Sequence, residues 1–163
     1  MNQSLDRRAL MLGLGGTAVA ALVGACRASP AVAETFPVQL SEAAWRKKLS
    51  PQAFNVLRKE ATERPYSSPL NNEKRAGTFT CAGCANPLFS SKTKFESGTG
   101  WPSFWAPLKG SVGTRRDVSL GIPRTEVHCA RCGGHQGHVF DDGPPPTGKR
   151  YCMNGAAMNF RPS

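Results

Sequence analysis

The 163-residue sequence lacks the patterns that mark several large classes of protein. It has no heptad repeat, no internal repeat beyond two Cys-x-x-Cys pairs and no alternation of strands with helices, so coiled-coil and collagen-like proteins are excluded. It also has no P-loop or dinucleotide-binding motif, so no nucleotide cofactor is expected. Acidic residues are few, 11 against 21 lysines and arginines. The net charge of +10 permits nucleic acid or an anionic membrane as a partner without establishing either.

What the sequence does contain is typical of a single globular domain with many turns. Hydrophobic residues make up 39% of the chain and charged residues 20%, with 17 glycines and 13 prolines. A chain of this length has room for one modest core and not for two ordinary domains. Without a heptad, a monomer is the default expectation.

The first 33 residues resemble a bacterial export signal. Arg7 and Arg8 precede an uncharged stretch, residues 9–26, and Ala31-Val32-Ala33 predicts cleavage before Glu34. The arginine pair resembles the twin-arginine signal, which exports proteins that are already folded. This chain is therefore expected in the bacterial periplasm. Cleavage would remove three arginines and one aspartate and lower the net charge from +10 to +8.

Other interpretations of this segment stay open. The stretch is diluted by glycine and is short for a membrane span, although an uncleaved anchor is an alternative. The arginines can also be ordinary residues of a signal peptide. Residues 23–26 resemble a lipobox, which would make Cys26 a lipidated N-terminus.

The remainder is predicted to be a linker, residues 34–44, followed by one domain, residues 45–163. Ser41 and Ser50 are N-cap signals that predict two short helices. From Thr78 onward, strand-sized runs near residues 78–80, 116–120, 125–128, 138–140 and 150–153 alternate with turn residues. The pattern favours a mainly β fold with an antiparallel sheet and helices confined to the N-terminal part.

Four cysteines form a matched pair of knuckles that predicts a structural zinc site. They are Cys81, Cys84, Cys129 and Cys132. Four thiolates complete a tetrahedral Zn²⁺ and leave no position for water, so one structural zinc per chain is expected. Two disulfides, or two redox-active pairs, are the alternatives.

Cys152 is then the odd cysteine, and its neighbours make it a candidate nucleophile. Arg150 and Asn154 lie two residues away on either side, and His135 and His138 occur shortly before. Cationic or donor groups near a thiol favour the reactive thiolate. A lone cysteine or histidine is also common as an ordinary core residue. The aromatic cluster that contains Trp101 and Phe104 can be core or the wall of an apolar pocket.

Together these segments resemble the B-type peptide methionine-R-sulfoxide reductases, over about residues 45–160. The matching segments, in the same order as in that family, are residues 62–65, 97–104, 124–127, 134–140 and 148–157, together with both knuckles. The resemblance implies two antiparallel sheets with short N-terminal helices. It also implies reduction of the R epimer of methionine sulfoxide in oxidised proteins, as a repair activity.

The resemblance assigns a role to each candidate residue. Cys152 attacks the sulfoxide sulfur and becomes a sulfenic acid. His135, His138 and Asn154 polarise and protonate the sulfoxide oxygen or orient water. Trp101 packs against the methyl group of the substrate, and Phe104 and Arg150 complete the substrate-binding set.

One position departs from the family pattern. Many members have a resolving cysteine where this chain has Thr99, so an external thiol such as a thioredoxin-like protein is expected to reduce Cys152. Two rival hypotheses remain: a basic zinc module that binds nucleic acid, and a zinc fold that binds partners without catalysis. The first fits poorly because the basic residues are scattered, so no nucleic acid partner is expected.

Overall fold

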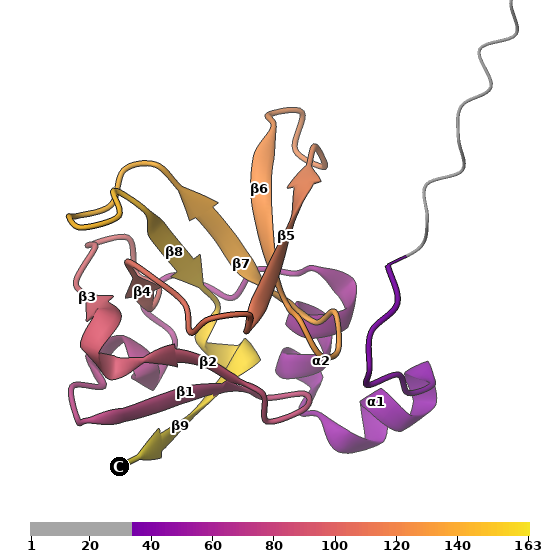
Figure 1. The fold of residues 1–163 in the computed structure, drawn as a ribbon. Coiled ribbons are helices and arrows are strands. Elements are labelled where there is room, and N and C mark those ends of the chain that lie inside the picture. The colour runs from indigo at the N-terminus through magenta and orange to yellow at the C-terminus, as the bar shows by residue number, and fades with distance from the viewer. Residues whose placement is uncertain (1–33) are drawn as a thin grey trace, which may run out of the picture. The chain divides into compact units, whose positions relative to one another are not determined.

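A computed structural model describes residues 34–163, which form one compact unit (Figure 1). The predicted signal peptide, its twin-arginine motif and Cys26 lie outside the described residues. Within residues 34–163, none of the helices has the length and hydrophobicity needed to span a membrane.

The two N-terminal helices begin at the predicted caps. Helix α1 spans Glu42–Lys48 and α2 spans Pro51–Lys59, and the hydroxyls of Ser41 and Ser50 each accept a hydrogen bond from the third following backbone N–H at 3.2 Å. Helix α2 ends at Glu60, which is in the left-handed conformation. Its buried stripe consists of Ala53, Phe54, Val56 and Leu57.

Part of the predicted linker packs on the domain. Helix α1 begins before residue 45, the backbone N–H of Val38 donates to the carbonyl of Arg131, and the ring of Phe36 meets His128 edge-on at 5.5 Å. An apolar side chain such as Phe36 is more stable against the domain than in water, which explains why this segment is held.

The remaining chain forms two antiparallel sheets, as predicted. The three-stranded sheet has the order β2-β1-β9, and the six-stranded sheet has the order β3-β4-β8-β7-β6-β5. The strands are β1 (Gly77–Cys81), β2 (Pro87–Ser90), β3 (Lys94–Phe95), β4 (Ser103–Phe104), β5 (Val112–Asp117), β6 (Arg124–Cys129), β7 (His135–Phe140), β8 (Arg150–Met153) and β9 (Met158–Pro162). There are three short 3-10 helices among the described residues: η1 (Pro69–Asn72) precedes β1, η2 (Ser91–Thr93) connects β2 to β3, and η3 (Gly155–Ala157) connects β8 to β9.

Three phenylalanine rings fill the space where the two sheets meet. Phe104 stacks on Phe89 at 4.3 Å and meets Phe79 edge-on at 4.9 Å, and all three are completely buried. Full burial of such a ring is worth about 1.5–3 kcal/mol. The three-stranded sheet is therefore fastened to the six-stranded sheet by an aromatic core.

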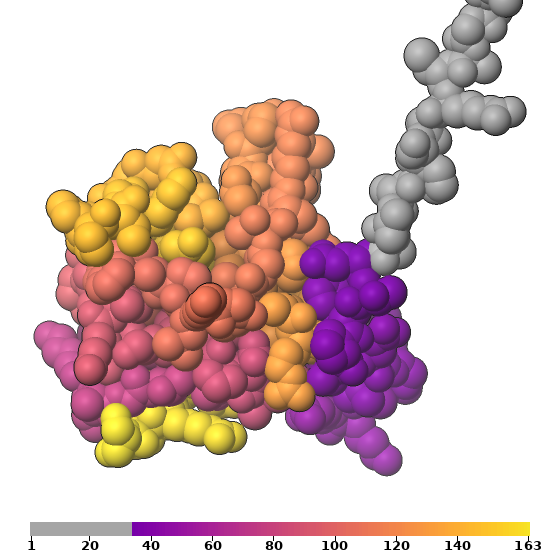
Figure 2. All heavy atoms as spheres, in the orientation of Figure 1, coloured from indigo at the N-terminus to yellow at the C-terminus, as the bar shows by residue number. Residues whose placement is uncertain are grey.

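The hairpin of β5 and β6 projects from the body of the molecule (Figures 1 and 2). A strand was expected over residues 116–120, but β5 ends at Asp117, whose carboxylate accepts a hydrogen bond from the backbone N–H of Ser119 at 2.8 Å. An aspartate bonded to the backbone two residues ahead starts a turn, which ends the strand early.

Candidate active site and metal centre

Both cysteine knuckles fold in the same way. In each, the N–H of the first cysteine donates to the carbonyl five residues ahead, and its carbonyl accepts from the N–H four residues ahead, at 2.8–2.9 Å. The residue after the second cysteine is left-handed in both: Ala85 has φ 58° and Gly133 has φ 64°. Glycine adopts this conformation without strain, whereas alanine does so at a cost.

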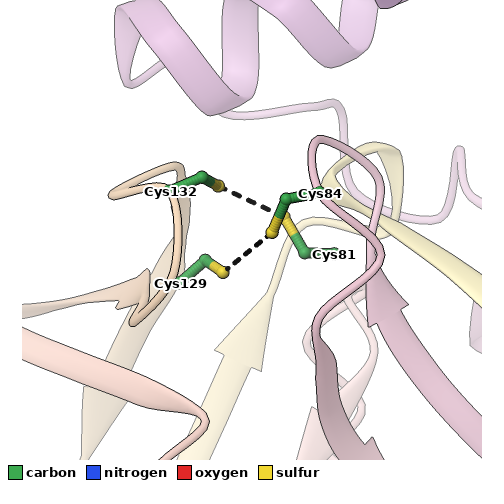
Figure 3. A group of neighbouring side chains, drawn as sticks. All are labelled: Cys81, Cys84, Cys129 and Cys132. Atoms are coloured by element: carbon green, nitrogen blue, oxygen red, sulfur yellow. Dashed lines mark hydrogen bonds between the residues drawn. The ribbon is translucent and has the colours of Figure 1, made fainter. Parts of the chain in front are cut away.

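The two knuckles face each other and form a cage of four sulfur atoms (Figure 3). The Sγ atoms of Cys81 and Cys132 are 3.7 Å apart, those of Cys84 and Cys129 are 3.5 Å apart, and all four lie within 4.8 Å of one another. Tetrahedral coordination with Zn–S bonds of 2.3 Å requires sulfur separations of about 3.8 Å. The cage therefore has the dimensions of a metal site, and no disulfide forms among the described cysteines.

The four thiols of the cage influence one another, and amide donors reach two of their sulfurs; without a metal, the pKa values of Cys81 and Cys132 are raised, by hydrogen bonds from neighbouring thiols and by burial. Amide groups of Asn86 and Gln136 donate to the sulfurs of Cys129 and Cys81, each at 3.6 Å. The neighbouring thiols, with Cys132 the strongest, hold the pKa of Cys129 well below its usual range. Cys81 ends β1 in one sheet and Cys129 ends β6 in the other, so a bound metal would join the two sheets.

Cys152 and His138 lie on one face of the six-stranded sheet. The register places Cys152 on β8 opposite His138 on β7, and opposite Ser103 on β4. Directly opposed residues on neighbouring strands point to the same face. Because neighbours along a strand alternate between faces, Phe104 points to the opposite face, into the aromatic core.

A β-bulge brings both histidines to this face. On β6, Val127 pairs with Gly137 while the next residue, His128, pairs with His135, so Gln136 is an extra residue in β7. In a regular strand, residues three apart point to opposite faces. With the extra residue, the rings of His135 and His138 meet edge-on at 5.4 Å.

Gly137 makes the bulge compatible with the neighbouring strand. Its φ is 155°, and a Cβ at this position would lie 2.1 Å from the carbonyl oxygen of Cys152. Any larger residue would push β8 and its thiol away from β7.

A pocket of about 130 Å³ opens on this face beside the thiol. A larger hollow of about 280 Å³ lies near η3, but it contains no thiol or histidine, so the smaller pocket is the candidate active site. The residues that line the smaller pocket are Thr62, Trp101, Arg124, Gly137, His138, Phe140, Cys152 and Asn154.

His138 is held in the pocket by a carboxylate. Its Nε2 lies 2.7 Å from Oδ2 of Asp117, and the same oxygen accepts from Nη2 of Arg124 at 2.5 Å. Hydrogen bonds from Ser119, together with that from His138, hold the pKa of Asp117 well below its usual range. Burial lowers the pKa of His138 although the bond to Asp117 acts in the opposite direction.

A similar arrangement holds His135 deeper in the protein. Its Nδ1 lies 2.7 Å from Oε1 of Glu126, which also accepts hydrogen bonds from Arg115. Burial raises the pKa of Glu126, but the bonds from His135 and Arg115 outweigh it and lower the pKa. Nε2 of His135 is buried without a partner among the described residues.

Glu63 positions two residues of the pocket. Its carboxylate accepts hydrogen bonds from the backbone of Gly155 and Ala156 at 2.6 and 2.8 Å. Its own backbone donates to Oδ1 of Asn154 at 3.0 Å and accepts from Nε1 of Trp101 at 3.1 Å. One buried residue thus fixes both the amide and the indole of the pocket.

The structure brings together most of the predicted site residues. Cys152, His138, Asn154 and Trp101 line the pocket. His135 lies behind it, and Phe104 is in the core on the other face of the sheet. Arg150 lies beside the pocket, with its guanidinium over the ring of Phe140 at 4.4 Å and bonded to Asp142 at 2.8–2.9 Å.

Sequence reasoning assigned no role to several residues that build this site. They are Thr62, Glu63, Asp117, Arg124, Glu126 and Phe140. Most lie in segments that carry the family resemblance, residues 62–65, 124–127 and 134–140, and that is the signal that could have found them. Asp117 lies outside those segments and is found only through the pairing of β5 with β6.

Comparison with known proteins agrees with this site. The SelR domain model matches residues 49–162, which include both knuckles and every residue of the pocket. A peptide methionine sulfoxide reductase MsrB of Bradyrhizobium diazoefficiens is 57% identical over 123 residues, which are 75% of this chain and 88% of that protein. The MsrB of Agrobacterium fabrum is 52% identical over 126 residues, 77% of this chain and 93% of that protein.

The similarity is not confined to bacteria. The MsrB of Methanosarcina barkeri is 53% identical over 125 residues, which are 76% of this chain and 88% of that protein. Identity of this degree over most of the length of each relative, together with the domain match over residues 49–162, makes this chain a member of the SelR domain family.

Proposed function

We propose that this protein reduces the R epimer of methionine sulfoxide to methionine, with Cys152 as the nucleophile. The observation that carries the proposal is the pocket, in which a half-buried thiol shares a small cavity with a histidine, an amide and an indole. The names of its MsrB relatives support the same reaction.

The chemistry follows from what a sulfoxide needs. The thiolate of Cys152 attacks the sulfoxide sulfur, and the S–O bond breaks as its oxygen accepts protons. The oxygen leaves as water, and a second water molecule attacks the Cys152 sulfur of the resulting S–S sulfonium, which breaks the S–S bond and releases methionine. Two electrons have then passed from Cys152 to the substrate, and the cysteine is left as a sulfenic acid. His138 is the proton donor in its imidazolium form, in which Nε2–H stays bonded to Asp117 and Nδ1–H is left for the sulfoxide oxygen; the bond to Asp117 favours this charged form, and the amide of Asn154 hydrogen-bonds the same oxygen.

The pocket volume suits a side chain better than a whole protein segment. About 130 Å³ accommodates the end of one methionine sulfoxide, with its methyl group against Trp101, which would fix the face of the chiral sulfur that meets Cys152. Next to the pocket, the tip of the β5–β6 hairpin exposes three apolar side chains, Val118, Leu120 and Ile122. They support a protein-bound substrate, because a polypeptide that flanks the sulfoxide can pack on them.

The reducing equivalents come from an external thiol. That thiol attacks the sulfenic acid, water leaves, and a second thiol releases Cys152 from the mixed disulfide. The hydroxyl oxygen of Thr99 lies 3.7 Å from the sulfur of Cys152. Where many members of the family have a resolving thiol, this chain therefore presents a hydroxyl to Cys152. A thioredoxin-like partner in the exported compartment fits this chemistry.

The sulfur cage is assigned to one structural zinc ion. Cys81, Cys84, Cys129 and Cys132 would hold it, and four thiolate ligands favour zinc over hard cations. Zinc there would supply folding energy and take no part in the reaction. Metal analysis should give one zinc per chain, lost together with the folded state on chelation; a metal-free protein that is equally stable would contradict this assignment.

We further propose that the chain acts outside the cytoplasm, with cleavage before Glu34 and release into the periplasm. The Arg7-Arg8 pair and the Ala31-Val32-Ala33 site support this proposal. Mass spectrometry of the exported protein distinguishes an N-terminus at Glu34 from a lipidated Cys26.

The proposed reaction is tested with the separated R and S sulfoxides of an N-blocked methionine and dithiothreitol as the reductant. Turnover of the R epimer alone, abolished in Cys152→Ser, is the expected result. Absence of turnover in zinc-loaded protein would instead support the alternative, a zinc fold that binds partners without catalysis. A Cys152 disulfide with another cysteine of the chain after one turnover would contradict the need for an external thiol.

A further inference from the structure

A chain of three hydroxyl groups leads to the Cys152 sulfur. Oγ of Ser103 is 3.1 Å from the carbonyl oxygen of Trp101 and 2.7 Å from Oγ of Ser97. Oγ of Ser97 is 2.8 Å from Oγ1 of Thr99, which is 3.7 Å from the sulfur of Cys152. Ser103 is completely buried, so the chain starts at a side chain closed to solvent and ends at the reactive atom.

Each hydroxyl has one hydrogen to donate, and this fixes the direction of the chain while Cys152 is a thiol. The carbonyl of Trp101 can only accept, so Ser103 donates to it. Ser97 must then donate to Ser103, and Thr99 must donate to Ser97. The oxygen of Thr99 is left as the acceptor for the S–H of Cys152.

Loss of the thiol proton to water reverses every bond in the chain. The thiolate can only accept, so Thr99 turns its hydrogen to the sulfur. Ser97 then donates to Thr99 and Ser103 donates to Ser97, which releases the carbonyl of Trp101. Only hydroxyl hydrogens rotate, and no heavy atom has to move.

We propose that Thr99, with Ser97 and Ser103 behind it, is a reversible hydrogen-bond chain that stabilises the thiolate of Cys152. Thr99 touches the reacting sulfur and is a catalytic residue, whereas Ser97 and Ser103 are positioning residues. Bonds to an anion are stronger than bonds to a neutral group, and a chain polarised by the anion strengthens further. The proposal rests on the proposed role of Cys152, and it gives Thr99 a function of its own in place of a resolving thiol.

The test is the rate at which iodoacetamide alkylates Cys152 as a function of pH, followed by mass spectrometry of the Cys152 peptide in the full, metal-loaded chain. Thr99→Val should slow alkylation about tenfold at pH 7 and move the midpoint of the curve up by about one pH unit. Thr99→Ser should restore the rate to within about threefold. Ser97→Ala should slow it by about threefold, because Thr99 keeps its own bond to the sulfur.

The control variant is Thr93→Val. Thr93 is the last residue of η2, and its hydroxyl bonds the carbonyls of Ser90 and Ala106 instead of the Cys152 sulfur. His138 on β7, Arg124 on β6 and Arg150 on β8 are the charged or titratable groups around the thiol, and every variant retains them. Equal curves for the wild type and Thr99→Val, or an equal slowing in Thr93→Val, would overturn the proposal.

Alkylation requires no sulfoxide, so this test is independent of the proposed reaction. If the wild type fails to reduce methionine sulfoxide but Thr99→Val still shifts the curve, the hydroxyl chain stands and the proposed reaction does not. If turnover is normal and the curve does not shift, the reaction stands and the chain does not.

Discussion

The same sheet face carries two histidines that are held in nearly the same way. His138 is hydrogen-bonded to Asp117 on β5. Asp117 is paired with Arg124 on β6, which lies two strands from β8, the strand of Cys152. His135 is bonded to Glu126, which is paired with Arg115, the residue directly opposite it on β5. In both, the carboxylate accepts from an imidazole and a guanidinium.

The two groups differ in depth. The side chain of His138 is 11% exposed and lines the pocket, whereas those of His135 and Glu126 are only 3% and 4% exposed. An ionised carboxylate at that depth depends on its partners, and removing one is expensive. The comparison teaches that one arrangement can serve the reaction at the pocket and stability beneath it.

Replacing each histidine by asparagine should separate the two roles, and this is the largest effect we expect. His138→Asn removes the proton donor and should lower kcat/KM for R-methionine sulfoxide by about 10²–10⁴-fold. His135→Asn should change it by less than about tenfold while lowering the free energy of unfolding by about 1–3 kcal/mol. Steady-state kinetics and urea unfolding of both variants provide the measurement; equal losses of activity would erase the distinction.

Replacing the carboxylates should show the same division in stability. Glu126→Gln leaves the buried His135 without its charged partner and Arg115 with only the exposed Glu60, and it should lower the free energy of unfolding by about 3 kcal/mol. Asp117→Asn, the matched variant at the pocket, should lower kcat with a much smaller change in the urea midpoint. The comparison fails if Asp117→Asn is the more destabilising substitution.

The pH dependence of stability should contain a separate step for each group. The folded-state pKa of His138 is lowered, so the unfolded chain binds the proton first, and stability present above pH 6.5 is lost as the pH falls through the folded value. The pKa of Glu126 is also lowered, so its contribution is present above pH 4.5 and is lost at lower pH. The free energy of unfolding is measured by urea unfolding at a series of pH values. Its step at higher pH should be absent in His138→Asn, and its step at lower pH should be absent in Glu126→Gln.

The outermost ion pair should matter least. Glu60 pairs with Arg115 at 2.6 Å, but both side chains are exposed, at 60% and 44%. Exposed pairs contribute little and are screened by salt, so Glu60→Gln should change the free energy of unfolding by less than about 1 kcal/mol. The difference from the wild type should shrink further in 1 M NaCl, and a persistent loss would mean that Glu60 supports Glu126 from outside.

The sequence predicted the metal cage better than it predicted the pocket. Cys-x-x-Cys spacing fixes the turn around each pair of sulfurs, so residue identity and spacing are enough to find the cage. The pocket depends on which strands are neighbours and on their register. Pairing of β4 with β8 turns Phe104 into the core, and β4 has only two residues, too few to show an alternating pattern.

The bulge in β7 also could not be predicted from the alternation of residues along a strand. A regular strand would separate His135 from His138, and only the extra residue places them on one face. The helix caps at Ser41 and Ser50 were predictable because they depend on neighbouring residues alone, and the structure confirms them. The roles assigned to the pocket residues remain predictions for the variants above.

The extra residue of the bulge also connects the pocket with the metal cage. The side-chain amide of Gln136 donates a hydrogen bond to the sulfur of Cys81. The backbone carbonyl of Gln136 accepts hydrogen bonds from the backbone N–H and the side-chain amide of Asn154, at 2.7 and 3.1 Å. An oxidant that reached the cage and released its metal would therefore also displace a residue of the pocket. A methionine sulfoxide reductase built in this way would be limited by oxidation of its own cage, through the one glutamine that joins its two sulfur centres.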